Sequence, residues 1–286
     1  MNTSIKLLAA LLAGLAGAVA AKAETLKDLA GQTHYHGIAF ARSGAASLLL
    51  ATHHGLFAVD KEGQATRVSP VQDFMGFSPH PGDPLTYYAS GHPAGGGNAG
   101  FLKSTDGGST WTQLSAGAGG PVDFHQMDAS AADPKTIYGV FGTMQVSHDG
   151  GETWSVEGEP PAALIAIAAS ALKAERIYAA TKNGLHVSSD NGASWQLLAF
   201  EGEIVSAVKT GDDGALYAFV LGRGLMMAKE SAAQDWQALS NGFGEAIPLH
   251  IAVDPADGKH LALATQTNAV LESKDGGANW QPFGAP

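Results

Sequence analysis

Short runs of β-branched and aromatic residues alternate with small residues along most of this chain, and turn residues separate the runs. Residues 136–140, 176–180 and 215–219 are clear examples. Alternation of small and large side chains between Asp, Gly and Pro is typical of buried strands rather than of amphipathic helices. The 37 glycines and 13 prolines supply the many turns that such short strands need. The pattern predicts an all-β protein.

An octapeptide of the form Ser-x-Asp-x-Gly-x-(Thr/Ser/Asn)-Trp divides the chain into units. It occurs at residues 104–111, 147–154, 188–195 and 273–280, and a degenerate copy ends at Trp236. The tryptophans therefore recur every 41 to 44 residues, which is about the length of one four-stranded propeller blade. Residues 56–60, followed by Gly63, take the place of a sixth, degenerate copy. We expect a six-bladed β-propeller with four-stranded blades and Asp-box hairpins.

Each residue type in the octapeptide has a structural reason to be there. The Asp accepts backbone N–H bonds inside a turn, the Gly adopts a positive φ, and the Trp packs between neighbouring blades. The four aspartates of the intact copies are therefore expected to be structural rather than catalytic: Asp106, Asp149, Asp190 and Asp275.

The first residues resemble a secretory signal. A basic segment ends at Lys6, an apolar run follows over residues 7–20, and Ala21-Lys22-Ala23 has the small-x-small form of a cleavage site. We expect a signal peptide over residues 1–23 and a single propeller domain over residues 24–286, soluble, monomeric, and periplasmic or secreted. An uncleaved membrane anchor is the alternative, although the run is short for a bilayer span of about 20 residues.

Composition narrows the range of partners. The formal charge is −11, and no basic cluster follows the first segment, so nucleic acid and anionic membrane surfaces are poor candidates. The chain has no cysteine. Disulfides and thiolate metal ligands are therefore excluded, and stability must come from packing and strand pairing.

Five further segments carry a resemblance that covers nearly the whole chain after the signal: residues 34–38, 51–56, 75–77, 90–93 and 123–125. The chain resembles an exported bacterial Asp-box (BNR-like) β-propeller family that carries the label F510_1955-type glycosylhydrolase. That family is related in fold to the sialidase and sortilin-type propellers. The resemblance implies the propeller fold, and its label suggests glycoside hydrolysis, although a shared fold does not establish an activity.

Sialidase chemistry is not expected. It requires an arginine clamp for the substrate carboxylate, and the four arginines after the signal, Arg42, Arg67, Arg176 and Arg223, occupy places in the repeat that do not converge. Another glycosidase would need only two carboxylates near the channel. Asp73 and Asp123 precede inner strands and are candidates, although turn capping is the simpler interpretation. The sequence identifies no catalytic residue.

Histidines fall at equivalent places in several units. The first strand of a propeller blade lines the channel and begins at the face where the second strand ends. We place the starts of the first strands at this face, and they carry His36, Met75, His125 and His250. The ends of the second strands lie at the same face, and they carry His53, His54, His92 and Met144. These side chains are expected to gather at one mouth of the channel.

Imidazoles with thioethers and without thiolates suit copper, and zinc is the second candidate. We expect the metal to be held by His36, His54, His92 and His125, with Met75 as a softer ligand and His34, His53 and His250 as additional candidates. His53 and His54 alternate along the chain, so only one should point inward. There are three alternatives. The histidines could have ordinary local roles, the same mouth could bind a small molecule or a protein partner, or a glycoside hydrolase could act there.

Overall fold

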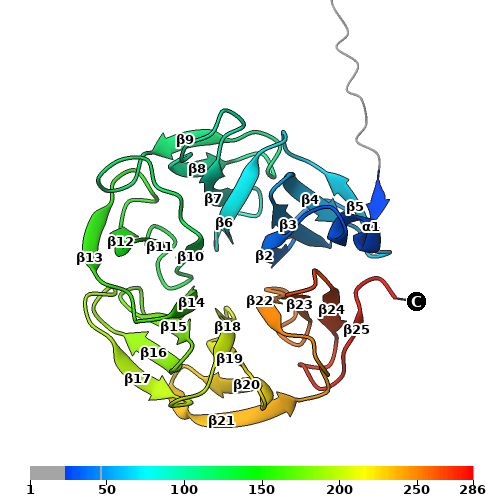
Figure 1. Cartoon of the computed structure of the whole chain (residues 1–286), viewed down its shortest axis with the longest axis vertical. Coiled ribbons are helices and arrows are strands. Elements are labelled where there is room, and N and C mark those ends of the chain that lie inside the picture. Colours follow the sequence, from blue (N-terminus) through cyan, green and yellow to red (C-terminus); the bar gives the residue numbers. More distant parts are fainter. Residues whose placement is uncertain (1–22, 46, 286) are drawn as a thin grey trace, which may run out of the picture.

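Six antiparallel sheets form a ring around a central channel in the computed structural model (Figure 1). The structure describes residues 23–45 and 47–285, so the expected signal segment lies almost entirely outside the described residues. The six-bladed all-β propeller predicted from the tryptophan spacing is confirmed. Within the described ranges, no helix is long and apolar enough to cross a membrane.

Each blade is built from consecutive strands, the first beside the channel and the last at the rim. Blade 1 contains β2 (Tyr35–Phe40), β3 (Leu48–Thr52), β4 (Gly55–Val59) and β5 (Gln64–Arg67). Blade 2 contains β6 (Asp73–Pro79), β7 (Tyr87–His92), β8 (Phe101–Ser104) and β9 (Thr112–Ser115). Blade 3 contains β10 (Gln126–Ala129), β11 (Ile137–Phe141), β12 (Thr143–Ser147) and β13 (Ser155–Gly158).

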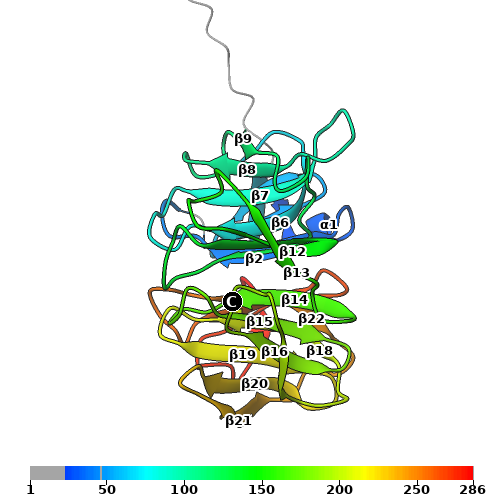
Figure 2. The ribbon, with the colours of Figure 1, turned by 90° about the vertical axis from the view of Figure 1, so that its left-hand side faces the viewer.

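The second half of the ring repeats this plan (Figures 1 and 2). Blade 4 contains β14 (Leu164–Ala169), β15 (Ile177–Thr181), β16 (Gly184–Ser188) and β17 (Gln196–Ala199). Blade 5 contains β18 (Val205–Thr210), β19 (Ala215–Val220), β20 (Gly224–Lys229) and β21 (Ala232–Ser240). Blade 6 contains β22 (Pro248–Val253), β23 (Leu261–Thr265), β24 (Val270–Ser273) and β25 (Gln281–Pro282).

Blade 1 departs from the four-stranded plan. A short strand, β1 (Glu24–Thr25), pairs with its outermost strand β5. The single-turn helix α1 (Leu26–Ala30) follows, and the Thr25 hydroxyl caps it by accepting a hydrogen bond from the Asp28 N–H at 3.1 Å. The first blade therefore has five strands.

The Asp-box of blade 3 shows how the motif closes its hairpin. Asp149 Oδ1 accepts the Thr153 N–H at 2.9 Å, and its Oδ2 accepts the Thr153 hydroxyl at 2.6 Å. These hydrogen bonds lower the pKa of Asp149 to about 2. Gly151 has a φ of 95°, which favours glycine. Trp154 packs against Phe101 of blade 2, with ring centroids 5.1 Å apart, so the expected packing between blades is present.

The degenerate copies keep the hairpin by other means. In blade 1, Asp60 Oδ1 accepts the N–H groups of Glu62 and Gln64 at 3.0 and 2.8 Å. In blade 5, the nine-residue strand β21 carries Trp236, whose ring lies 4.9 Å from that of Phe200 in the preceding blade. The repeat therefore survives as a turn in one blade and as an aromatic contact in the other.

Blades 1 and 6 meet without exchanging a strand, because every strand of each comes from one continuous stretch of chain. Side chains join them instead. The Asn268 side chain accepts the Tyr35 N–H at 3.4 Å and donates to the Ala30 carbonyl at 3.2 Å. Leu29 of α1 and Phe283 belong to one buried cluster shared by the two blades. The ring is thus closed by a seam of packed side chains.

Candidate functional site

A β-bulge recurs at the start of the inner strands and determines which side chains reach the channel mouth. In β2, the pairing with β3 skips one residue between Tyr35 and Gly37. The same shift occurs in β6, β14, β18 and β22. A bulge leaves one residue unpaired and redirects its side chain. The unpaired residues are His36, Met75, Ile165, Ser206 and Leu249.

Four of these bulge residues line a cleft of about 280 Å³ at the channel mouth. They are His36, Met75, Ile165 and Leu249, and the lining also includes His34, His125 and His250. Four of the repeat-equivalent positions, His36, Met75, His125 and His250, therefore converge on this cleft, and the additional candidate His34 joins them. For His36 and Met75 the structural cause is the bulge rather than simple strand alternation.

His36, His53 and Asp73 form the tightest group at this mouth. The Nε2 atoms of His36 and His53 lie 3.0 Å apart, and His53 Nδ1 lies 2.9 Å from Asp73 Oδ1. One ligand atom from each of the three residues lies within 4.8 Å of the other two. Burial, with a smaller contribution from His53, lowers the pKa of His36 to about 4. The ring of His36 is therefore neutral at physiological pH and keeps a lone pair for a ligand.

A second group continues from the first across blades 2 and 3. His92 Nδ1 lies 3.1 Å from Asp73 Oδ2, and His92 Nε2 lies 3.4 Å from Asp123 Oδ2. The same Asp123 oxygen is 2.7 Å from His125 Nε2. Together, His36, His53, Asp73, His92, Asp123 and His125 form one continuous polar chain over three blades.

The two aspartates of this chain are not the turn caps that the sequence favoured. Asp73 is the first residue of β6, and both of its oxygens contact imidazoles. Asp123 is buried, with a side-chain exposure of 7%, and its contacts are His92 and His125. Both carboxylates therefore belong to the candidate site.

The structure separates His53 from His54. Both lie in the turn between β3 and β4 rather than on a strand. His53 points to His36 and Asp73, whereas His54 is exposed, and its ring makes no hydrogen bond to any residue that the structure describes. His53 therefore takes the place that the sequence analysis gave to His54.

The remaining candidates have different surroundings. His34 is exposed, and its ring lies 5.9 Å from that of His53, edge to face. His250 Nε2 lies 3.1 Å from the Tyr35 carbonyl oxygen. Met144 is not at the end of a second strand as expected, but in the third strand β12, where it is fully buried in the core between blades 3 and 4.

Deeper in the channel, an ion pair links blades 3 and 5. Lys209 Nζ lies 2.8 Å from Asp128 Oδ1, and both residues line a narrow cavity of about 60 Å³ beneath the histidines. Asp128 also accepts the Ser78 hydroxyl and the Ala169 N–H, at 3.1 and 3.0 Å. The Asp128 carboxylate thus finds its hydrogen-bond and ion-pair partners within the protein, so we assign the Asp128–Lys209 pair a structural role.

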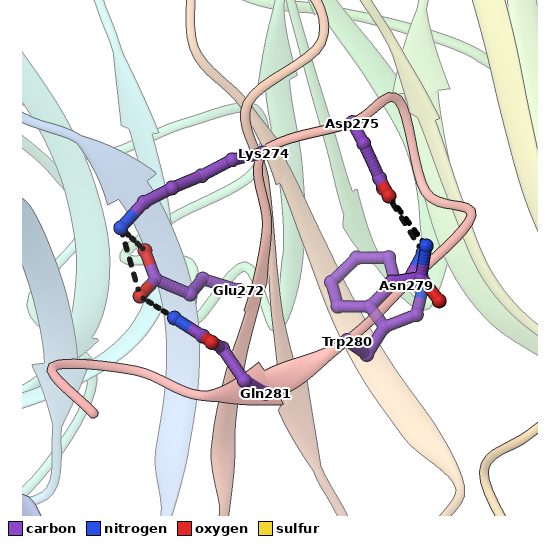
Figure 3. A pocket seen from close by; sticks show the side chains of 6 residues that line it. All are labelled: Glu272, Lys274, Asp275, Asn279, Trp280 and Gln281. Atoms are coloured by element: carbon purple, nitrogen blue, oxygen red, sulfur yellow. Dashed lines mark hydrogen bonds and ion pairs between the residues drawn. The ribbon is translucent and has the colours of Figure 1, made fainter. Parts of the chain in front are cut away.

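A different hollow lies at the rim of blade 6, next to its Asp-box (Figure 3). Its polar side chains already pair with one another. Gln281 donates to Glu272 at 3.0 Å, Lys274 lies 3.2 Å from the same carboxylate, and Asn279 donates to Asp275 at 2.7 Å. None of the six residues that line it is a histidine. This hollow therefore adds no residue to the histidine cluster at the channel mouth.

Fold and hairpins together define a BNR-type β-propeller. The family model of the BNR/Asp-box repeat matches residues 145–156, which include the Asp-box of blade 3. A comparison with curated proteins gave no significant sequence match.

Solved structures with the same fold come from several functional classes. A GH74 xyloglucanase from Xanthomonas campestris is 20% identical, with a TM-score of 0.59 over 88% of this chain and 45% of the enzyme. YCF48 from Cyanidioschyzon merolae is 16% identical, with a TM-score of 0.56 over 88% of this chain and 85% of that protein. An extracellular domain from B. thetaiotaomicron is 13% identical, with a TM-score of 0.55 over 87% and 33%. This chain thus spans less than half of the xyloglucanase, and these likenesses establish the fold alone.

Proposed function

We propose that this chain is an exported, non-enzymatic propeller that binds a divalent transition metal, with copper as the first candidate, at His36, His53 and Asp73. The observation that carries the proposal is the approach of two imidazole Nε2 atoms to 3.0 Å with a carboxylate oxygen close by. Two ligands bound to one ion at about 2.0–2.2 Å are themselves about 3 Å apart. The two rings are therefore nearly at the spacing that a shared ion requires.

Hydrogen bonding supports a ligand role for His53. Asp73 Oδ1 contacts the Nδ1 side of this ring at 2.9 Å, so the proton is held on Nδ1 and the lone pair of Nε2 faces His36. Metal-binding histidines characteristically donate their second N–H to a carboxylate in this way. Asp73 therefore orients His53 and also lies close enough to supply an oxygen ligand.

Donor chemistry selects the metal. Two imidazoles with a carboxylate suit copper(II) and zinc rather than calcium or magnesium, and copper binds most tightly in the divalent series. Met75 lines the same cleft and adds a thioether. The absence of cysteine from the chain leaves no thiolate to compete for the ion. Export of the chain is supported by the signal-like first residues and by the extracellular propeller domains among its structural neighbours.

The test is a titration of Cu(II), and separately of Zn(II), into protein purified without an affinity tag. His36→Ala, His53→Ala and Asp73→Asn should each lower the affinity of this site, by about 10- to 100-fold for the orienting carboxylate. His54→Ala is the matched control, because it removes the adjacent but exposed imidazole. Binding by His53→Ala as tight as by wild type would contradict the proposal.

The alternative is a glycoside hydrolase that acts at the same face. The GH74 enzymes among the structural neighbours share the propeller fold of this chain. Its two candidate carboxylates, Asp73 and Asp123, are both engaged by imidazoles, which leaves neither as an evident acid for a glycosidic oxygen. Turnover of aryl glycosides that persists in the presence of a chelator would favour the hydrolase.

A further inference from the structure

Asp73, the carboxylate of the proposed metal site, is held from two sides. Its Oδ1 atom accepts a hydrogen bond from Nδ1 of His53 at 2.9 Å, and its Oδ2 atom accepts one from Nδ1 of His92 at 3.1 Å. Asp73 and His92 are also direct partners across the β6–β7 ladder, where one begins its strand and the other ends its strand. His92 therefore fixes the carboxylate that orients His53.

The other nitrogen of the His92 ring faces a second carboxylate. His92 Nε2 lies 3.4 Å from Asp123 Oδ2, and the Asp123 side chain is only 7% exposed. Within the described ranges, the Oδ1 atom of Asp123 has no hydrogen-bond partner, and the ion-pair contacts of this carboxylate are the imidazoles of His92 and His125. A buried carboxylate is strongly disfavoured without such partners. The environment of Asp123 therefore keeps the His92 ring in place.

Asp123 itself is anchored in the core between blades 2 and 3. Its two neighbours in the chain, Val122 and Phe124, are fully buried. The Phe124 N–H donates to the Ser90 hydroxyl at 2.9 Å, and the Phe124 ring lies 4.8 Å from that of Trp154. The contacts at the channel mouth thus continue into a closely packed part of the fold.

We propose that His92 is a positioning residue of the metal site. Held by Asp123, it fixes Asp73, so that the second oxygen of Asp73 keeps His53 turned toward the ion. Each nitrogen of His92 faces a carboxylate, which leaves neither for the metal. This inference rests on the proposed metal-binding function and adds the layer of residues that holds its ligands, a layer that contributes about 10- to 100-fold to the affinity of metal sites.

Three substitutions at His92 test the role, because they differ in where they leave a hydrogen-bond donor. His92→Ala removes both contacts. The amide nitrogen of His92→Asn lies near the place of Nδ1, and that of His92→Gln lies near the place of Nε2. In a titration of untagged protein with Cu(II), the Ala and Gln variants should bind about 10- to 100-fold more weakly than wild type, whereas the Asn variant should retain most of the affinity.

Two controls accompany this series. His54→Ala removes an exposed imidazole nearby and should bind as wild type does. The His92 side chain is 39% exposed, so its replacement should leave the urea denaturation midpoint of the metal-free protein unchanged. Electron paramagnetic resonance of bound Cu(II) should show the same number of coordinating nitrogens in wild type and His92→Ala.

A double substitution tests the link to Asp123. Asp123→Asn should lower the Cu(II) affinity of the wild type but have no further effect when combined with His92→Ala, because it acts through His92. Additive losses of affinity would show that Asp123 acts independently and would overturn the link.

The remaining outcomes separate this role from the metal site itself. Weakened binding by His53→Ala together with full binding by His92→Ala overturns the positioning role and leaves the metal site standing. Equal losses in His92→Asn and His92→Ala also overturn it, and so does the loss of one coordinating nitrogen in His92→Ala, which would make His92 a ligand. Absence of copper binding by the wild type overturns the proposed function and this role with it.

Discussion

The Nε2 atom of His250 in blade 6 lies 3.1 Å from the backbone carbonyl oxygen of Tyr35 in blade 1. A carbonyl oxygen only accepts, so His250 donates the hydrogen bond and joins the last blade to the first. Burial lowers the pKa of His250 to about 4. The ring is therefore neutral in the folded protein over most of the acidic range.

This depressed pKa predicts that the fold loses stability in mild acid. Between pH 6.5 and 4, the unfolded chain takes up a proton at His250 and the folded chain does not, so falling pH favours unfolding. The contribution is fully present above pH 6.5 and lost by pH 4, and it amounts to about 3 kcal/mol. Urea denaturation at several pH values measures it. The pKa of His36 is also lowered to about 4, so His36 adds to the same limb and His250→Leu should reduce its slope only in part. A slope unchanged from wild type would show that His250 does not contribute.

His36 predicts an unusual pH behaviour of metal binding. Imidazole must be deprotonated to bind a metal, and the pKa of His36 is already lowered to about 4. Its ring is therefore ready to bind at pH 7.5 and at pH 5.5 alike. The ratio of Cu(II) affinities between wild type and His36→Ala should be the same at both pH values. A ratio that collapses toward one at pH 5.5 would mean that His36 is protonated there.

Trp154→Ala should destabilise the protein by at most about 3–5 kcal/mol, the usual cost of deleting a large and fully buried aromatic side chain, because the indole is partly buried. The indole packs against Phe101 and Phe124 and donates from Nε1 to the Ser115 hydroxyl at 3.0 Å. Val156→Ala on the adjoining strand is a suitable control, because this side chain is 55% exposed. Equal denaturation midpoints for the two variants would refute the packing role of the tryptophan.

Sialic acid should not be released from a model substrate. Arg42 is hydrogen-bonded to Asp212 at 3.2 Å, and Arg223 is paired with Glu203 at 2.6 Å. Arg67 is the last residue of β5, the fourth strand out from the channel in blade 1, and Arg176 lies just before β15. None of the four arginines lines the histidine cleft, so no clamp for a substrate carboxylate can form there. Steady turnover would contradict this assignment.

The blades could be predicted from sequence because each Asp-box is a local structure. Ser147, Asp149 and Trp154 complete their turn within eight residues, so spacing alone located the hairpins. The gathering of His36 and Met75 at one mouth followed from their equivalent places in the repeat. The position of a residue within the repeat therefore predicts where that residue lies in the propeller.

The partners of individual side chains could not be predicted in the same way. His53 and His54 were treated as strand residues, but β3 ends at Thr52, and a turn decides which ring faces Asp73. Asp73 looked like a turn cap because its imidazole partners come from a loop of the preceding blade and from the far end of β7. Local composition does not encode contacts that depend on the register of two strands.

The seam between blades 1 and 6 also has a mechanical consequence. Among the described residues it contains no sheet ladder, so parting it would leave all six sheets intact and convert the ring into an open arc. The His36, His53 and Asp73 donors belong to blades 1 and 2 and would move as one unit, whereas His250 would leave with blade 6. Opening of the ring at this joint would thus leave the three donors of the proposed metal site together.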